Sequence, residues 1–375
     1  MDLDFTEEQD LLRQTVRELC ARHSTMDIVR ALEDDAAGFR RELWDELGKT
    51  GLLGLTIAEE RGGAGLGPLE LAVVYEELGR AIAPTPHLVS AVIGAGLIRA
   101  GGTEEQQQAW LPRIASGEAI VTVAWHEPEG SSGPEGIRLP AHGGKLTGTK
   151  IMVPYASSAD AILVLAREGA VVAAHLVDPT ADGVTLTQTP SMGSEADYQL
   201  DLADTPGDRL PGDGQTILDE AMADGLIAIA AYAIGGAERA HEMAVEYAKE
   251  RIQFDRPIGS FQAIAHPLAD MATEVEGGRV LVFEAAWRRS MGLDMGPLGA
   301  MAKLYACDVF RRATKIGQQV FGGIGFTRDI DMQLYFRRAK QLEITWFDPR
   351  YLEEIVARAE LDAERPFVGI DAAVE

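Results

Sequence analysis

The sequence predicts an α+β protein in which two helical regions flank a smaller β-rich region. The chain has 375 residues with 46% hydrophobic content, enough to bury a large core and to form two or three domains. Helical periodicity dominates both ends, whereas the middle consists of short β-rich runs separated by Gly, Pro, Ser and Asp. We therefore expect an N-terminal helical domain at 1–117, a middle antiparallel β-barrel or sandwich domain at 118–208, and a C-terminal four-helix bundle at 209–375.

Capping signals mark the helices of the first region. Thr6 with Gln9, and Thr103 with Gln106, have the spacing of a capping box, and apolar residues follow at three- and four-residue steps. The glycine-rich stretch RGGAGLGPLE at 61–70 has no strand before it and no Lys-Ser/Thr after it, as a phosphate loop would. We expect a plain interhelical loop there.

The middle and last regions differ in the length of their periodic segments. Between Ala119 and Leu202 the β-rich runs are short, with turn residues about every ten positions, which is typical of a small antiparallel barrel or sandwich. The segment 204–214, rich in Pro and Gly, is expected to be a linker. Helix-length segments follow at 218–250, 261–291, 297–321, 331–343 and 350–363.

Charge and cysteine content exclude several classes of protein. A formal net charge of -25 argues against a nucleic-acid surface or an anionic-membrane surface, because both require cationic patches. No run approaches the 18 apolar residues of a membrane span, and the acidic N-terminus lacks the features of a signal peptide. Cys20 and Cys307 are too few and too far apart to indicate a disulfide framework or a metal site. We expect a cytoplasmic protein with two reduced thiols.

One local stretch is basic. Between Arg311 and Lys340 there are seven Lys or Arg and two Asp, and the same stretch contains QQVFGGIGFT, whose glycines let a backbone approach a ligand closely. This pattern favours a phosphate-bearing small molecule. A solvated basic helix that ends in a glycine cap remains the alternative.

Two motifs resemble those of the acyl-CoA dehydrogenase family. The first is R-x-Q-F-x-x-P-I-x-x-F-Q-x-x-x-x-x-L-A-D-M at 251–271, and the second is Q-x-F-G-G-x-G-F at 319–326. They occur in the expected order, and the helix, β, helix arrangement matches that family along almost the whole chain. The resemblance implies FAD as cofactor, an acyl-CoA thioester as substrate, α,β-desaturation as the reaction and an electron-accepting flavoprotein as a partner.

The resemblance also assigns residues to the cofactor. It implies that Arg251 reaches the pyrophosphate of an FAD bound to a neighbouring chain, with Phe254 beside it and Gln253 facing the same cofactor. Gln319 and Gly323 match residues that contact the adenine end. A guanidinium suits a pyrophosphate because its planar donors pair with two oxygens at once. Such contacts imply a homo- or hetero-oligomer, either a dimer or a tetramer.

The segments that match the family's flavin-binding loops depart from its pattern. In AWHEPEGSSG at 124–133, Trp125 and His126 replace the usual pair, while Glu127, Pro128 and Ser132 are kept. We expect Trp125, His126 and Ser132 to lie at the cofactor. For His126 alone, a structural histidine is the alternative reading.

The second flavin-binding segment is KIMVPYASSAD at 150–160. Met152 stands where the family has a Trp over the flavin ring, and Pro154 stands where a Thr hydrogen-bonds it. Proline has no hydroxyl to offer, so FAD is expected to bind in a modified way or weakly. His126 or Tyr155 is the candidate for the missing polar contact.

The catalytic base is the main departure. Desaturation requires a carboxylate aligned with the α-proton of the thioester in a water-poor site. The two positions that carry this Glu in the family fall on Trp346 and Gly225, and a neighbouring CoA-pairing Arg falls on Leu226. Asp224 is the candidate base that remains at the second position.

Two further carboxylates flank the first of these positions. Glu343 and Asp348 lie near Trp346 in the sequence, and a solvated or capping carboxylate is the alternative reading for both, as it is for Asp224.

Three functions are compatible with these residues. The first is an FAD-dependent acyl-CoA dehydrogenase, working alone or as one subunit of a hetero-oligomer. The second is a catalytically silent subunit that completes the FAD site of a related, base-bearing chain. The third is a flavin oxidase or monooxygenase on the same fold, because fold alone does not fix chemistry.

Overall fold

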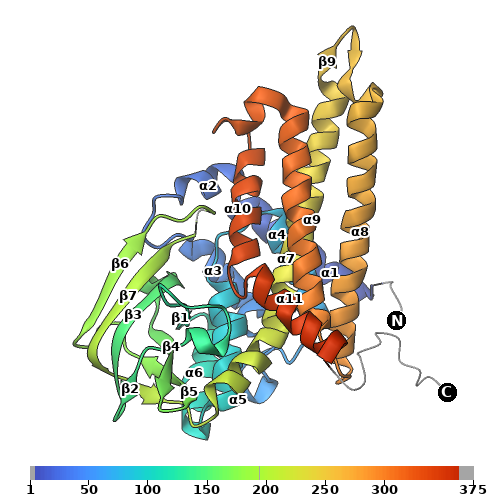
Figure 1. The fold of residues 1–375 in the computed structure, drawn as a ribbon. Coiled ribbons are helices and arrows are strands. Elements are labelled where there is room, and N and C mark those ends of the chain that lie inside the picture. The colour runs from blue at the N-terminus through green and yellow to red at the C-terminus, as the bar shows by residue number, and fades with distance from the viewer. Residues whose placement is uncertain (1–4, 194, 363–375) are drawn as a thin grey trace, which may run out of the picture. The chain divides into compact units, whose positions relative to one another are not determined.

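The computed structural model describes residues 5–193 and 195–362, which form two compact units (Figure 1). One unit consists of 14–71 and 83–225, and the other of the described parts of 1–13, 72–82 and 226–375. Helices open and close the chain, and strands occupy the middle, as the sequence predicts. No helix among the described residues is both long and apolar enough to cross a bilayer.

The helices before the strands begin where the capping signals predict. Both capping boxes form, with Gln9 N donating to Thr6 Oγ1 at 3.2 Å and Gln106 N donating to Thr103 Oγ1 at 3.2 Å. The glycine-rich stretch is a loop between a 3₁₀ turn, Glu59–Arg61, and helix α4, which confirms the expectation. The helices of this part are α1 Glu7–His23, α2 Met26–Ala31, α3 Arg41–Lys49, α4 Pro68–Arg80, a π-helix Leu88–Gly94, α5 Ala95–Gly101 and α6 Glu104–Ser116.

The strands form two four-stranded sheets in the first unit. The order is β1-β4-β5-β8 in one and β2-β3-β7-β6 in the other. The strands are β1 Val121–Ala124, β2 Ala141–His142, β3 Lys145–Pro154, β4 Ala161–Glu168, β5 Val171–Val177, β6 Val184–Thr189, β7 Asp197–Pro206 and β8 Asp208–Arg209.

Two expectations for this region are corrected. The sheets are not wholly antiparallel, because β1 and β4 pair in parallel. The chain leaves β1, runs through β2 and β3 in the other sheet, and returns to β4 in the same direction. The expected linker at 204–214 is also wrong in part, since β7 extends to Pro206 and β8 pairs with β5 before the next helix begins at Gly214.

The C-terminal helices end within a few residues of the predicted limits, except that the last is shorter and continues as a π-helical turn, Arg358–Asp362. They are α7 Gly214–Glu250, α8 Gln262–Ser290, α9 Leu298–Phe321, α10 Met332–Ile344 and α11 Pro349–Ala357. Small residues let helices approach closely in the second unit. A Cβ on Gly79 would lie 2.0 Å from Tyr232 O, and one on Gly235 would lie 1.9 Å from Glu76 O, so α4 and α7 cross with their backbones in contact.

Candidate functional site

A short hairpin joins α7 and α8 and carries the first motif (Figure 1). Strands β9, Ile252–Gln253, and β10, Arg256–Pro257, pair around a turn whose central residues, Phe254 and Asp255, have φ of 53° and 63°. Left-handed non-glycine residues are strained, and such strain concentrates at functional sites. The Phe254 side chain is 86% exposed at this turn, and Arg251 and Gln253 are exposed beside it. The hairpin therefore presents a cation and an aromatic ring to the surroundings.

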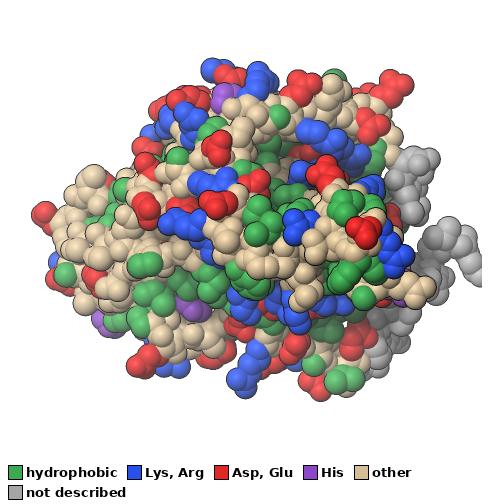
Figure 2. Space-filling model, turned by 90° about the horizontal axis from the view of Figure 1, so that it is seen from above, with side chains coloured by type: hydrophobic (Ala, Val, Ile, Leu, Met, Phe, Trp, Pro, Cys, Tyr) green, Lys and Arg blue, Asp and Glu red, His purple; other side chains and the backbone are tan. Residues whose placement is uncertain are grey.

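The second motif lies at the same end of the bundle. Phe321, the last residue of α9, stacks on Tyr247 near the end of α7, with ring centroids 4.4 Å apart. The glycines that follow form a 3₁₀ turn, Gly322–Phe326, and a Cβ on Gly322 or Gly323 would meet no atom within 4 Å. The backbone of this turn is therefore open to a ligand. Seen from above, apolar side chains lie exposed among charged ones (Figure 2).

Gln319 lies in a groove between α8 and α9. The groove has a volume of about 430 Å³ and combines apolar side chains, among them Ile264, Ile316 and Val320, with the cations Arg312 and Lys315. Arg312 is held by Glu274 at 2.6 Å and by Asp308 at 2.9 Å. Apolar walls with a few polar groups are typical of small-molecule sites.

Glu127, in the first segment expected to bind flavin, is held by a buried lysine that the sequence does not reveal. Lys150 Nζ lies 2.6 Å from Glu127 Oε1 and 3.1 Å from Trp125 O, and the lysine is fully buried. Burial lowers the pKa of Lys150 to about 8, although Glu127 opposes this shift. Burial would raise the pKa of Glu127, but Lys150 and two backbone N–H groups, those of Leu139 and Arg138, lower it. A lysine directly before the apolar residues IMVP of β3 was the available signal.

The residues expected at the flavin offer few side-chain donors. Trp125 is 7% exposed and packs edge-on to His126 at 5.1 Å, and Ser132 is buried. Met152 has a left-handed backbone with φ of 54°, and the carbonyl of Pro154 accepts the hydroxyl of Thr122 at 2.5 Å.

Tyr155 is the other candidate for the missing polar contact. It is 3% exposed, and its ring meets that of Phe39 edge-on at 5.9 Å. The tyrosine is therefore packed within the first unit.

Gly225 and Asp224 lie in the first unit, on α7. A Cβ on Gly225 would lie 3.3 Å from Met222 Sδ and 3.4 Å from Ile93 Cγ1, so this position faces apolar neighbours. Asp224 is 5% exposed, and its Oδ2 accepts from Arg99 Nη2 at 3.0 Å. Arg99 also donates to Thr56 O at 3.1 Å. The candidate base is thus held in a partly buried ion pair.

Trp346 lies in the second unit, between α10 and α11, and is 8% exposed. The two nearby carboxylates both have structural partners. Glu343 pairs with Lys340 at 2.6 Å and with Arg311 at 3.5 Å. Asp348 caps α11 by accepting from the backbone N of Arg350 and Tyr351. Over residues 5–193 and 195–362, no cluster of His, Cys, Asp or Glu could hold a metal ion.

Comparison with known proteins identifies the family. Models of the acyl-CoA dehydrogenase N-terminal and C-terminal domains match residues 6–118 and 212–346. Acyl-CoA dehydrogenase FadE27 of Mycobacterium tuberculosis is 34% identical over 357 residues, covering 92% of this chain and 94% of that protein. The chain belongs to the acyl-CoA dehydrogenase family. Members of this family are oxidoreductases that act on CH–CH bonds.

Solved structures of acyl-CoA dehydrogenases share the whole fold. The ChsE4-ChsE5 complex from Mycobacterium tuberculosis contains a chain that is 33% identical, with a TM-score of 0.88 over 98% of this chain and all of that one. A variant of the Tcur3481-Tcur3483 steroid acyl-CoA dehydrogenase is 32% identical, with a TM-score of 0.84 over 94% of this chain and 98% of that one. Both structures are named for two different chains.

The residues of this acyl-CoA dehydrogenase fit one half of FAD better than the other. The exposed Arg251 and Phe254 and the open backbone at Gly323 suit a pyrophosphate and its adenosine. Met152 and Pro154 provide no side-chain donor for a flavin ring. When bound, FAD would accept the hydride of the desaturation.

Proposed function

We propose that this chain is an FAD-dependent acyl-CoA dehydrogenase subunit that works in a hetero-oligomer. Its Arg251, Phe254 and Gln319 complete the FAD site of a second, related chain, and that chain carries the catalytic base. The substrate is an acyl-CoA thioester, and the electrons pass to a flavoprotein acceptor. The assembly is a cytoplasmic dimer or tetramer.

The observation that carries this proposal is a contrast between two sets of residues: those at the expected positions of the base and those expected to contact the FAD of a neighbouring chain. Both family positions for the base lack a carboxylate, since one is Gly225 facing Ile93 and the other is the buried Trp346. The hairpin and the glycine turn, in contrast, keep the exposed residues that the family uses toward a neighbouring chain. A subunit that neither catalysed the reaction nor completed the FAD site of another chain would have no reason to keep a strained, exposed Phe254.

Asp224 remains the candidate if this chain supplies its own base. It lies one residue from the family position, which on a helix turns the side chain by about 100°. Its ion pair with Arg99 argues that it holds structure instead. In the assembled complex, Asp224→Asn is expected to leave turnover unchanged, and a loss of about 10²-fold or more would assign the base to Asp224.

The test is the visible spectrum of the chain alone and after co-expression with a related chain that carries the base. We expect the isolated chain to be nearly colourless and the complex to contain flavin that acyl-CoA bleaches without oxygen. Arg251→Met in this chain should lower the flavin content of the complex. Lys249→Met, an exposed cation two residues earlier, is the matched control.

Three outcomes would overturn this assignment or part of it. An isolated chain that is yellow and is bleached by acyl-CoA would be a complete enzyme. A complex that consumes oxygen rapidly in the presence of substrate would be a flavin oxidase or monooxygenase. Equal flavin content in the Arg251→Met and Lys249→Met complexes would remove the role of the hairpin.

A further inference from the structure

The segment that joins α10 to α11 has an unusual backbone. Trp346 and Phe347 are consecutive left-handed residues, with φ of 51° and 75°. Only glycine, and to a lesser extent Asn and Asp, adopts this conformation readily, and a bulky aromatic residue does so at a cost in energy. Both side chains are buried, at 8% and 4% exposure. Something in the surroundings must therefore hold this conformation in place.

Lys303 on α9 provides a buried cation directly beneath this segment. Its Nζ donates to Thr345 O at 2.7 Å, to Phe347 O at 2.6 Å and, at 3.5 Å, to Glu343 O. An ammonium has three donors, so these carbonyls occupy all of them. The two shorter bonds bracket Trp346 on either side.

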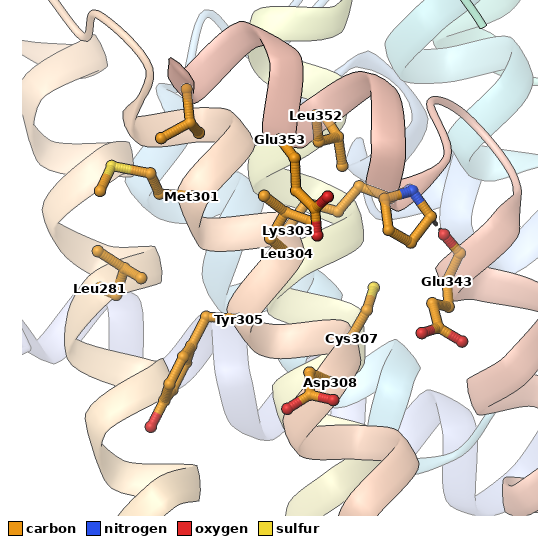
Figure 3. A pocket seen from close by; sticks show the side chains of 12 residues that line it. Leu281, Met301, Lys303, Leu304, Tyr305, Cys307, Asp308, Glu343, Leu352 and Glu353 are labelled. Carbon is orange, nitrogen blue, oxygen red and sulfur yellow. Dashed lines mark hydrogen bonds between the residues drawn. The ribbon is translucent and has the colours of Figure 1, made fainter. Parts of the chain in front are cut away.

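The chemistry of Lys303 is otherwise difficult to explain. The residue is 1% exposed, and its Nζ donates hydrogen bonds to backbone carbonyls, while the nearby carboxylates of Asp348 and Glu343 also favour its charged form. Its side chain lines a pocket of about 520 Å³ beside Cys307, Glu343 and Leu352 (Figure 3). Burial lowers its pKa to about 8, so the ammonium still prevails at pH 7. A buried charge is costly unless it is fully hydrogen-bonded, and here the hydrogen-bond acceptors are backbone carbonyls.

The position of these carbonyls explains why a cation is used. Glu343 O belongs to the last turn of α10, where unpaired carbonyls and the helix dipole favour positive charge. A neutral side chain would hold the same oxygens with weaker bonds.

We propose that Lys303 is a positioning residue that fixes the left-handed backbone of 345–347 and thereby sets the direction of the side chain at position 346. The link to catalysis rests on the proposed function, because position 346 matches the base of related enzymes. The link to backbone geometry rests only on the contacts of Lys303. In this chain Lys303 still holds the backbone at position 346, although the side chain at that position is a tryptophan and not a carboxylate.

The first test is hydrogen exchange of peptides that cover 341–349 in the full chain, followed by mass spectrometry. Lys303→Met keeps the length of the side chain and removes its donors, and should accelerate exchange in this segment about tenfold or more. Lys315→Met, an exposed lysine on the same helix, should leave it unchanged. Lys303→Gln keeps two donors without the charge and serves as the second variant if Lys303→Met does not fold. It should exchange faster than the wild type at 341–349.

Two results of this test would refute the positioning role. One is unchanged exchange at 341–349 in both Lys303 variants. The other is an equal acceleration along α7, α8 and α9, which would make Lys303 a general core residue.

The second test separates this inference from the proposed function. Trp346→Glu installs a carboxylate at the family position, and acyl-CoA-dependent dye reduction by the assembled complex is compared with and without Lys303→Met. A gain that Lys303→Met removes would support both proposals. If Trp346→Glu brings no gain while the exchange result holds, the positioning role stands and the assignment of position 346 to the reaction fails.

Discussion

At the scale of single residues, the ion pair with Arg99 gives Asp224 a structural role. Its carboxylate is almost fully buried, whereas the Arg99 side chain is 36% exposed. The resemblance implies that Asp224 lies one residue from the position of the base, but the sequence does not show that Arg99, 125 positions earlier, binds it.

The first prediction concerns the stability of this pair. Asp224→Asn should lower the free energy of unfolding by about 1–3 kcal/mol, because it weakens the charge-assisted bond to Arg99 in a buried setting. Chemical denaturation measures this change. A double-mutant cycle with Arg99→Met should show coupling between the two residues, and strictly additive effects would contradict the pair.

The second prediction concerns the thiols. Cys20 and Cys307 are both buried and form no disulfide within the described residues, and burial raises the pKa of Cys307 to about 11. A protonated, buried thiol reacts slowly because the thiolate is the nucleophile. At pH 8 a thiol-specific dye should label neither cysteine in the folded chain and both after unfolding in denaturant. Fast labelling of Cys307 in the folded chain would contradict the buried site.

At the scale of elements, Lys150 joins strand β3 to the loop that contains Glu127. Its ammonium reaches Glu127 and Trp125 O, and Glu127 Oε1 also accepts from the backbone N of Arg138 and Leu139. Three separate segments therefore meet at one carboxylate. This contact gives Glu127 a structural role in the fold.

The third prediction is that Lys150→Met destabilises the protein by about 3 kcal/mol at pH 7, because Glu127 loses its buried partner. Thr149→Val, with a side chain on the opposite face of β3, is a milder control. Thermal or denaturant unfolding measures both. A change below about 0.5 kcal/mol for Lys150→Met would show that the pair is not needed.

The same lysine gives stability a definite dependence on pH. The pKa of Lys150 is about 8 in the folded chain and that of a free lysine is 10.5, so between these values the unfolded chain binds the extra proton. The contribution of Lys150 to stability therefore rises with pH from about 8 to 10.5, by up to about 1.4 kcal/mol per pH unit. The stability of the wild type relative to Lys150→Met should increase across this window.

At the scale of the whole molecule, exposed apolar residues gather on the hairpin and the glycine turn of a strongly acidic chain. Ile252 is 51% exposed, Phe254 86%, Ile324 43% and Phe326 71%. Exposed apolar groups gathered at one end of a fold are a sign of a binding surface. The net charge of -25 keeps such a surface from associating at random.

The fourth prediction follows from this exposure. Phe254→Ser should change the free energy of unfolding of the isolated chain by less than about 0.5 kcal/mol, because the ring is already exposed to solvent in the folded chain. In the complex with a related chain it should reduce flavin content. Leu361→Ser, at a residue 80% exposed outside these segments, is the control. If Phe254→Ser lowered the free energy of unfolding of the isolated chain by clearly more than about 0.5 kcal/mol, the loss of flavin would follow from a weakened fold.

The sequence by itself determined the order of the regions, the limits of the long helices and both capping boxes. These depend on local periodicity and on hydrogen bonds between residues three apart, which a sequence displays directly. It also identified the family through two motifs, while the absence of a carboxylate at both usual base positions stays a prediction.

Only the tertiary structure decided what the remaining polar residues do. The parallel pairing of β1 with β4, the pair of Arg99 with Asp224, and the reach of Lys303 to the carbonyls beside Trp346 all join residues at least 40 positions apart. Their partners are chosen by packing, and in the case of Lys303 they are backbone oxygens that every residue possesses. No local pattern marks such contacts, so burial and distance had to be seen before these residues could be assigned.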